Sequence, residues 1–590
     1  MMFKKIFFCL CIFCFSKVNT QAQYPFPDPE SSGSLTNFVQ PPPNAAALGQ
    51  YADFPVSYFT GVPDISIPIY ELKDGDANLP ISLSYHASGI RVSEVASWVG
   101  LGWALNAGGV IVRTVRGTAD EGSYSEQGDY GNGAPVGYYL NYGLSTFPKL
   151  PYTNAQGQPQ SYNGGSGLPL THYAAEGLGS GLTDGEPDLF TFNFNGHTGK
   201  FLFDENRTPH LLKDDNLKIA VNFDSPDFVS WVITDENGVR YYFGQNQNGN
   251  NYERVIQQYP TPPDPERGPI TSWYLNEVIY PNNNDTINFT YADESYYYGD
   301  LSPESESVSF EATQSGSSPY SQQMMLDNTT NIITGRSNPP LPTVSSVDGM
   351  RLTGISSKNF NIVFEADNPR KDLENMGMEL DKIKVYSKIS GQCLRQFRFS
   401  YGYFASPFTI PFDLNSFPLS QYLSDSLRLK LLSMDEFSGD SSIVKPPYTF
   451  TYQDSLYLPR RLSFDQDHWG FSNNSSTPFN RYLTPGGIWL SLLGSSTGAG
   501  ANREPAWPQM SAGTLTGIKD PLGATTTFQY EANEAAGYLP TGNSMIGGLR
   551  IKQIMVKDST GNTVSIRKFQ EGAGLLDKVP NYVDNFRNEL

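Results

Sequence analysis

The sequence predicts an all-β protein, a multi-strand β-ribbon that forms a β-sandwich or a partial shell or barrel and has few helices. Three observations predict this class. Apolar and polar residues alternate with a period of two, first at Ile65, Ile67 and Ile69. The chain contains 55 Gly, 43 Pro and 35 Tyr, a composition typical of short strands joined by turns. A strand-turn-strand pattern also recurs through the second half of the chain.

The composition excludes several classes of protein. Only 17% of the residues are charged and 13% are aromatic, which is the opposite of the balance in a disordered chain. The formal net charge of −20 repels phosphate backbones, so we expect no nucleic-acid partner. The length is enough for roughly two to four domains with a sizeable core.

The N-terminus has the order of residues found in a secretory signal peptide. Residues 1–5 contain lysines, residues 6–15 are apolar, and residues 16–22 are polar, with a cleavage site expected near Ala22. The apolar run is about half of the roughly 20 residues that a spanning helix needs, so we expect no transmembrane segment after signal removal. These features predict a secreted protein or one on the outer cell surface.

The cysteines favour export from a bacterium. Cys9, Cys11 and Cys14 lie in the segment to be removed, and Cys393 alone remains, so the mature chain cannot form an internal disulfide. An exported protein of this size without disulfides suits bacterial export better than the eukaryotic secretory route. We therefore expect the outer surface of a Gram-negative bacterium, or its medium.

The predicted segments follow in order after the signal peptide, residues 1–22. Residues 23–55 are rich in Pro, Ser and Gly and predict an extended arm. Residues 56–300 predict an N-terminal β domain with a Gly- and Tyr-rich surface insertion at 124–185. Residues 301–347 are rich in Ser, Asn and Pro and predict a linker or a disordered loop. Residues 348–590 predict a region of degenerate β-repeats.

Within the first β domain, alternation predicts strands at residues 65–69, 81–85, 189–194, 200–203, 228–234 and 240–243. Asp235-Glu236-Asn237-Gly238 lies between the last two of these strands. Because Asn and Gly tolerate positive φ, this sequence predicts a hairpin turn.

The second half repeats one theme in units of about 15 to 23 residues. Each unit opens on apolar residues about three apart, makes a polar turn and closes on alternating aromatics. Such units cannot bury their apolar faces alone, so they predict a stacked β assembly. The openings and closings are Leu275, Val278 and Ile279 with Phe289 and Tyr291; Leu380 and Ile383 with Phe397, Phe399 and Tyr401; Leu429 and Leu432 with Tyr448, Phe450 and Tyr452; Leu515 and Ile518 with Phe528 and Tyr530; and Leu549, Ile551 and Ile554, which begin one more.

These residues resemble the YD/Rhs-repeat proteins, and specifically the N-terminal region of the toxin-complex and virulence-plasmid B-type shell proteins. The Asp520-Pro521-Leu522-Gly523 turn before Phe528 and Tyr530 is similar to one such repeat. More specific blocks run from about residue 56 to about residue 570. They are Ser88-Gly89-Ile90-Arg91-Val92; Val99-Gly100-Leu101-Gly102-Trp103-Ala104-Leu105; Gly108-Gly109-Val110-Ile111 with Arg113; Glu186-Pro187-Asp188-Leu189-Phe190 with Phe192, Phe194 and Gly199-Lys200-Phe201; Thr271-Ser272-Trp273-Tyr274-Leu275; Asp467-His468-Trp469-Gly470; and Gly547-Gly548-Leu549-Arg550-Ile551.

The resemblance implies a β-strand ribbon that winds into a hollow shell. In the family such shells encapsulate a C-terminal toxic cargo or serve at cell surfaces. The chain departs from the full family plan because it has no recognisable core-repeat terminus, self-cleavage segment or cargo domain. We therefore expect a truncated product, an N-terminal part or a stand-alone surface protein.

Two glycine patterns invite a catalytic or cofactor interpretation. Gly494-Ser495-Ser496-Thr497-Gly498 fits the Gly-x-Ser-x-Gly pattern of hydrolases, but a poor helix start follows it and no histidine follows His468. We interpret it as a Gly/Ser loop. Gly100-Leu101-Gly102 has Leu105 where a dinucleotide fingerprint needs its third glycine, and no βαβ unit follows. Close backbone packing at a turn accounts for it better.

Candidate metal and nucleophile sites are weak. Asp74, Asp76 and Asn78 have the early spacing of a calcium loop, but Leu79 replaces the turn glycine and Tyr85 replaces the bidentate acid, so we predict an acidic turn. A looser calcium site elsewhere stays open. The remaining candidates have no ligand spacing and lack a catalytic partner: the histidines His86, His172, His197, His210 and His468, and the thiol of Cys393, which we expect in a strand.

Acidic and aromatic residues leave a glycan hypothesis open. Asp184, Glu186 and Asp188 could supply paired carboxylates for glycoside hydrolysis, but Pro187 and a Phe-rich strand follow, so a solvated turn is our prediction. We likewise interpret Asp520-Pro521 as a turn and not as a self-cleaving bond. The many tyrosines and tryptophans suit sugar stacking as well as cross-strand packing.

The sequence thus predicts an exported, non-enzymatic β-rich shell segment or cell-surface interaction module of the YD/Rhs type, and the N-terminal part of a toxin-encapsulating protein is one form that such a segment takes. We assign no catalytic, cofactor-binding or metal-binding residue and no cofactor. Expected partners are a protein or a C-terminal cargo, or a surface glycan. The alternative is a glycan-binding or glycan-processing surface protein.

Overall fold

The structure, a computed structural model, describes residues 61–116, 119–120, 186–204, 207–213, 215–221, 229–247, 249–258, 268–281, 285–301, 306–310, 332–336, 342–408, 424–473, 483, 501–536, 543–570, 572 and 574–575. These residues all belong to one compact unit, Thr36–Pro580. The predicted signal peptide, the extended arm at 23–55 and the insertion at 124–185 lie outside them.

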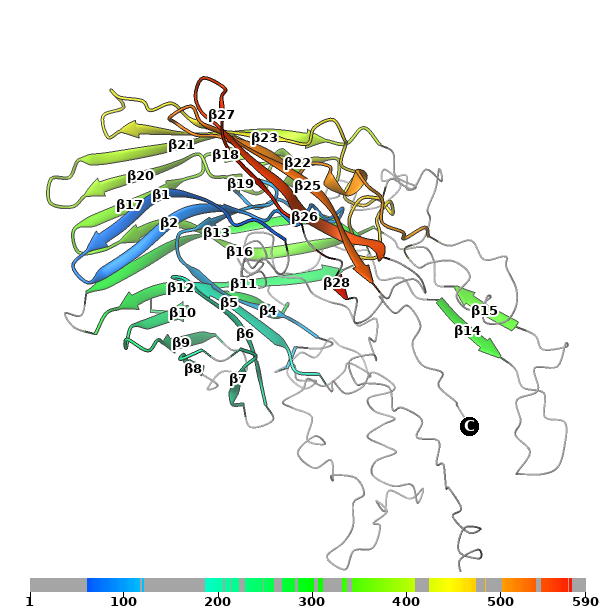
Figure 1. Cartoon of the computed structure of the whole chain (residues 1–590). Helices are drawn as coiled ribbons and strands as arrows, with labels where there is room; N and C mark the ends of the chain where they lie inside the picture. The colour runs from blue at the N-terminus through cyan, green and yellow to red at the C-terminus, as the bar shows by residue number, and fades with distance from the viewer. Residues whose placement is uncertain are drawn as a thin grey trace, which may run out of the picture. The chain divides into compact units, whose positions relative to one another are not determined.

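The predicted all-β class is confirmed. Regular structure in the described residues consists of β-strands and two short 3-10 helices, η3 (Lys371–Leu373) and η6 (Gln509–Ser511) (Figure 1). No helix among the described residues is long and apolar enough to cross a membrane.

The first sheet contains strands β1 (Ile65–Asp74), β2 (Ala77–Tyr85) and β3 (Trp103–Asn106), paired antiparallel in that order. Ile65, Ile67 and Ile69 are buried and the residues between them are exposed, as the alternation predicts. Gly75 makes the tight turn between β1 and β2 at a φ of +67°.

The next strands gather an aromatic core. They are β4 (Gly109–Thr114), β5 (Leu189–Phe194), β6 (His197–Phe203), β7 (Pro209–Leu211), β8 (Lys218–Val221), β9 (Ser230–Thr234) and β10 (Arg240–Asn246). The ring centroids of Phe190 and Phe201 lie 5.2 Å apart in a stacked pair, and Trp231 contacts both rings. The strong aromatic content of the sequence is therefore used here for packing between strands.

The predicted turn at residues 235–238 is confirmed. Oδ1 of Asp235 accepts hydrogen bonds from the backbone N–H groups of Asn237 and Val239, both at 2.9 Å. Gly238 has a φ of +80°, which a residue without a side chain adopts freely. The two strands β9 and β10 pair on either side of this turn.

The central strands close into a barrel. The ring contains β10 and four further strands, β11 (Gly249–Gln258), β12 (Ile270–Ile279), β13 (Thr286–Leu301) and β16 (Pro342–Ser356). The order around the ring is β10, β11, β16, β13 and β12, and β12 pairs back to β10. β10 and β11 follow the same edge of β12, with a short hairpin between them. The side-chain amide of Asn276 holds the base of this hairpin through Gly244 and Asn251.

The stretch 301–347, predicted as a linker, differs in its described residues. β14 (Glu306–Phe310) pairs with β15 (Ile332–Arg336), and the long strand β16 already begins at Pro342. β16 lies between β11 and β13 there, so Ser345 and Ser346 are buried although they are polar. Small hydroxyl side chains fit a strand with neighbours on both edges, and this packing overrides a composition that is typical of loops.

The second half forms a ladder of antiparallel strands, as the recurrent units predict. Each pairs with the next in the order β16, β17 (Phe360–Glu365), β20 (Lys382–Ser387), β21 (Cys393–Ala405), β22 (Leu427–Ser438), β23 (Tyr448–Tyr452), β24 (Leu515–Lys519), β25 (Thr525–Ala536), β26 (Asn543–Lys557) and β27 (Thr563–Lys568). Two-residue strands are β18 (Asn368–Pro369), β19 (Met378–Glu379) and β28 (Gly574–Leu575). Figure 1 shows the strands of the ladder in yellow-green to red.

The turn predicted at Asp520-Pro521 is confirmed. Oδ1 of Asp520 accepts hydrogen bonds from the N–H groups of Leu522 and Ala524, both at 2.9 Å. Gly523 completes the turn at a φ of +86°.

One hydrophobic core joins the two halves of the chain. The indole N–H of Trp103 in β3 donates to the hydroxyl of Tyr452 in β23 at 2.9 Å, and that hydroxyl donates to the carbonyl of Leu431 at 2.7 Å. The backbone N–H of Leu515 donates to the hydroxyl of Tyr85 at 3.0 Å. The sheet and its core therefore cross the position, near residue 347, where the sequence suggests a domain boundary.

Candidate functional site

Three of the sequence blocks meet in space, although more than 350 positions separate the first from the other two. We call this place the motif junction; it contains residues 88–92, 467–471 and 547–551. The backbone N–H of Val92 donates to the carbonyl of Gly470 at 2.8 Å, and the N–H of Leu549 donates to the carbonyl of Ser88 at 2.8 Å. Backbone hydrogen bonds therefore join the N-terminal sheet region to the end of the ladder.

Asp467 organises the loop at the motif junction. Its side chain is fully buried, and Oδ1 accepts hydrogen bonds from the N–H groups of Trp469 and Phe471, both at 2.9 Å. The other carboxylate oxygen, Oδ2, has no hydrogen-bond partner among the described residues. Burial raises the pKa of Asp467 to about 6, against the lowering effect of these N–H groups and of Arg503.

Glycines allow the close approach of the three segments. A Cβ on Gly547 would lie 2.7 Å from Cβ of Trp469 and 2.9 Å from Oδ2 of Asp467. Gly89, at a φ of +104°, packs against the rings and side chains of Phe471 and Leu549. The glycines of these blocks are therefore required by space and by backbone conformation.

A second buried charge lies beside the motif junction. The carbonyl of Arg503 accepts a hydrogen bond from the N–H of His468 at 3.0 Å. Its guanidinium Nε and Nη1 are buried and have no hydrogen-bond partner among the described residues. The positive charge of Arg503 lowers the pKa of His468, in addition to the larger effect of burial.

A buried ion pair joins two other blocks and corrects a sequence-based expectation. Asp188, predicted to lie in a solvated turn, is fully buried against Arg113, which is buried as well. Nε of Arg113 donates to Oδ2 of Asp188 at 2.6 Å, and the N–H groups of Arg116 and Asp120 also donate to this carboxylate. The turn prediction failed because it considered only the residues next to Asp188, whereas its partner lies on β4, 75 positions away.

The other two acids considered for glycoside hydrolysis are Asp184 and Glu186. Glu186 is exposed and Asp184 lies outside the described residues. The structure therefore gives no separation between paired carboxylates at this position.

The Gly-Leu-Gly-Trp block packs backbone against backbone, as its sequence predicts. Gly100 and Gly102 have φ values of +111° and +74°. The N–H of Leu101 donates to the carbonyl of Leu429 at 2.8 Å, and a Cβ on Gly102 would lie 2.7 Å from the ring of Tyr85.

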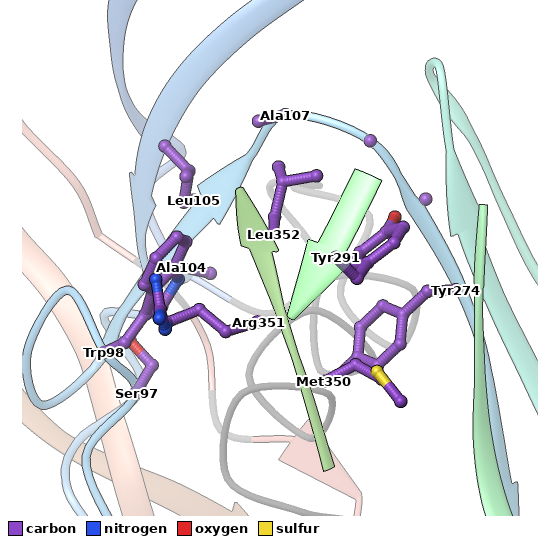
Figure 2. A pocket seen from close by; sticks show the side chains of 12 residues that line it. Ser97, Trp98, Ala104, Leu105, Ala107, Tyr274, Tyr291, Met350, Arg351 and Leu352 are labelled. Carbon is purple, nitrogen blue, oxygen red and sulfur yellow. The ribbon is translucent and has the colours of Figure 1, made fainter. Parts of the chain in front are cut away.

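The residues on either side of positions 100–103 line a small cavity of about 50 Å³. Figure 2 shows Trp98, Leu105, Tyr274, Tyr291 and Arg351 around it; Trp98 comes from the turn before β3 and the other four from β-strands β3, β12, β13 and β16. Apolar and aromatic groups therefore form most of its wall. The full lining is Ser97, Trp98, Ala104, Leu105, Ala107, Gly108, Gly109, Tyr274, Tyr291, Met350, Arg351 and Leu352.

Two buried acids lie behind this cavity. Nε of Arg351 lies 3.2 Å from Oε1 of Glu294, and burial nevertheless raises the pKa of that acid. Glu253 accepts a hydrogen bond from the N–H of Met350 at 3.2 Å, and burial raises its pKa to about 8. This shift favours the protonated form of Glu253 at neutral pH, and Glu253 adds to the effect of burial in raising the pKa of Tyr274.

The acidic turn at residues 74–78 holds two sheets together. Asp74 accepts hydrogen bonds from the hydroxyl of Ser357 at 2.6 Å and from the backbone and side-chain N–H groups of Asn359 at 2.7 and 2.6 Å. The carboxylate of Asp74 is therefore bound by two side chains and one backbone N–H group of a distant turn. Among the described residues, no group of three His, Cys, Asp or Glu side chains is arranged to hold a metal ion.

The histidines are dispersed. His86 is half-buried, and desolvation together with the charge of Arg91 lowers its pKa to about 4. His197 lies 3.9 Å from Asp235, and His210 lies 2.9 Å from Asp204. His468 belongs to the motif junction, and His172 lies outside the described residues.

Cys393 begins β21, as expected for a strand residue. Its thiol donates to the carbonyl of Arg395 at 3.4 Å, and partial burial raises the pKa of the thiol. A raised thiol pKa disfavours the nucleophilic thiolate. The Gly-x-Ser-x-Gly segment at residues 494–498 lies outside the described residues.

Sequence reasoning did not single out Glu253, Arg503 or the buried pair Arg370 and Asp372. The guanidinium of Arg370 donates to both carboxylate oxygens of Asp372, at 3.1 and 2.8 Å, and to the carbonyl of Ala96 at 2.9 Å. For Glu253, the sequence contained one indication of a buried charge: the acid lies close to the apolar residues Tyr252 and Val255 of a strand.

Comparison with known proteins gives structural neighbours only. No known protein family and no curated protein matches the sequence. The structure resembles Tc toxin components: a TcdB2-TccC3-Cdc42 complex (11% identity, TM-score 0.29, 67% of this chain and 16% of that one) and a TcdB2-TccC3 complex (10%, 0.30, 85% and 21%). It also resembles the N-terminal domain of the effector protein SpvB from Salmonella typhimurium strain LT2 (10%, 0.26, 63% and 98%). The chain thus spans only 16% of the first neighbour's length, and at these TM-scores the likeness does not establish a common fold.

Proposed function

We propose that the protein is an exported, non-enzymatic structural module of the YD/Rhs type, which serves as a shell segment or as a cell-surface interaction module. The observation that carries the proposal is that the sequence blocks which resemble the family contact one another inside the fold. Residues 88–92, 467–471 and 547–551 form backbone joints with one another, and Arg113 and Asp188 join β4 to the start of β5. The residues that resemble the family therefore serve to hold strands together.

The charges of these blocks support the same role. Arg113 and Asp188 neutralise each other in the interior, and Oδ1 of Asp467 is occupied by N–H groups of its own loop. Groups bound in this way are positioned to stabilise the fold and are not directed at an external substrate. The signal-like N-terminus supplies the export, and the acidic net charge of −20 suits a protein that remains dispersed outside the cell.

Fractionation of native cells tests the export and the size of the protein. An antibody against the β ladder should detect it in the outer-membrane or medium fraction, at a mass below the 65.2 kDa of the printed chain because the signal has been removed. A much larger band in the same fraction would identify the chain as the front of a complete shell protein. A band of full mass in the cytoplasm would contradict export.

A further inference from the structure

The ladder of the second half ends on a strand with one edge open. β27 pairs with β26 along one side, and no strand among the described residues pairs with its other side, because β28 pairs with β25. All six of its residues are exposed, in contrast to β24 and β25 before it, each of which has buried residues. A row of backbone N–H and C=O groups at such an edge can accept another strand.

β27 exposes two large apolar side chains to solvent. Val564 and Ile566 are 67% and 51% exposed, and Ile566 lies opposite Met555 of β26 on one face of the hairpin. An added strand would cover these apolar groups, because cross-strand neighbours on one face lie within contact distance.

The charge at this edge is opposite to that of the whole chain. Arg567 and Lys568 end β27, and Lys557 lies on β26 beside it, whereas the net charge of the protein is −20. Lys552 of β26 lies 3.7 Å from Glu531 and is neutralised by it. Arg567 and Lys568 have no ion-pair partner among the described residues. Two copies of this edge would bring like charges together, so the charge disfavours pairing with a second copy and favours an acidic strand.

We propose that β27 is a docking edge for an extended, acidic segment of a partner polypeptide, which adds to the ladder as a further β-strand. Backbone hydrogen bonds to β27 would hold the segment in register. Apolar residues at every second position would cover Val564 and Ile566, and carboxylates would lie near Arg567 and Lys568. This binding mode depends on the open edge alone and does not require export or a shell.

A pair of synthetic peptides tests the proposal with the full chain. Both have eight residues with valine at alternate positions; one carries glutamate and the other lysine at the remaining charged positions, and each bears a fluorophore for anisotropy measurements. We expect the glutamate peptide to bind at least about tenfold more tightly than the lysine peptide, and salt to reduce this difference. Equal binding of the two peptides, or none, would overturn the proposal.

Two variants locate the binding at β27. Arg567→Glu combined with Lys568→Glu should reverse the preference in favour of the lysine peptide. Val564→Lys combined with Ile566→Lys should weaken binding of the glutamate peptide by removing the apolar contact. All four side chains are exposed, so both variants should fold, and thermal unfolding followed by circular dichroism verifies this.

The matched control changes an exposed isoleucine elsewhere. Ile389, between β20 and β21, is 83% exposed, and Ile389→Lys should leave peptide binding unchanged. An unchanged preference in the Arg567→Glu/Lys568→Glu variant would overturn the assignment to β27. A concentration-dependent dimer that the Val564→Lys/Ile566→Lys variant abolishes would also overturn it and assign the edge to a second copy of the chain.

Discussion

A single carboxyl oxygen at the motif junction has a measurable consequence for stability. Oδ2 of Asp467 is buried without a partner among the described residues, and burial raises the pKa of the acid to about 6. The folded state therefore holds this proton more tightly than the unfolded state. The resulting stabilisation is complete below the ordinary pKa of an aspartic acid and is lost as the pH rises through about 6.

Asp467→Asn should remove this dependence on pH, because the amide carries no charge. Between about pH 4 and about pH 8, the stability of the variant relative to the wild type should improve by about 2 kcal/mol. Urea unfolding of both proteins across this range measures the difference. Asp558→Asn is the contrasting control: hydrogen bonds from Thr560 and Asn562 lower the pKa of Asp558, so its effect on stability has the opposite sign and is confined to pH values below about 4, and the variant should show little change across this range. A constant difference between Asp467→Asn and wild type would contradict the interpretation.

Gly547→Ala should destabilise the motif junction by about 1–3 kcal/mol. The added Cβ would lie 2.7 Å from Cβ of Trp469, so the loop at residues 467–471 would have to move. Gly572→Ala is the control, since a Cβ there meets nothing within 4 Å. Denaturant unfolding of the two variants provides the comparison, and equal stabilities would show that the junction has room for a methyl group.

At the scale of elements, the joint between β4 and β5 depends on charge neutralisation. Arg113→Met leaves the carboxylate of Asp188 buried without its cation, and the expected loss is about 3–5 kcal/mol. Adding Asp188→Asn to Arg113→Met removes the buried charge that has lost its cation. The double variant should therefore recover part of the lost free energy of unfolding. The free energies of unfolding of the single and double variants test the coupling. A double variant less stable than Arg113→Met would contradict it.

Local pattern was sufficient to predict most strands. The alternation at 189–194 gives the bounds of β5, and the apolar pair Leu515 and Ile518 with Phe528 and Tyr530 gives β24 and β25. It failed at Ser345 and Ser346, whose burial depends on neighbours on both edges of β16. Local pattern also failed at Asp188 and did not find Arg503 or Glu253, because the contacts that bury these charged residues come from distant parts of the chain. The resemblance located the junction residues, but sequence alone could not bring residues 88–92 and 547–551 together.

At the scale of the whole molecule, one tyrosine hydroxyl links the first sheet to the ladder. Tyr452→Phe would leave the buried indole N–H of Trp103 without its acceptor, at an expected cost of about 1–3 kcal/mol. Tyr457→Phe, at a residue that is 59% exposed, should have no measurable effect. Thermal unfolding of the two variants tests the link. Equal melting temperatures would show that packing alone joins the two parts.

The contact between Tyr85 and Leu515 also sets the order of events during synthesis. The two residues are separated by 430 positions, and contacts of such long range form slowly and late. The apolar faces of β1, β2 and β3 have no complete cover until the strands after residue 510 have been made. A growing chain therefore cannot complete this core during most of its translation, and a chain without its completed core suits passage through a narrow translocation channel. For the export proposed above, the ends of the core then meet only after nearly the whole polypeptide has passed to the far side.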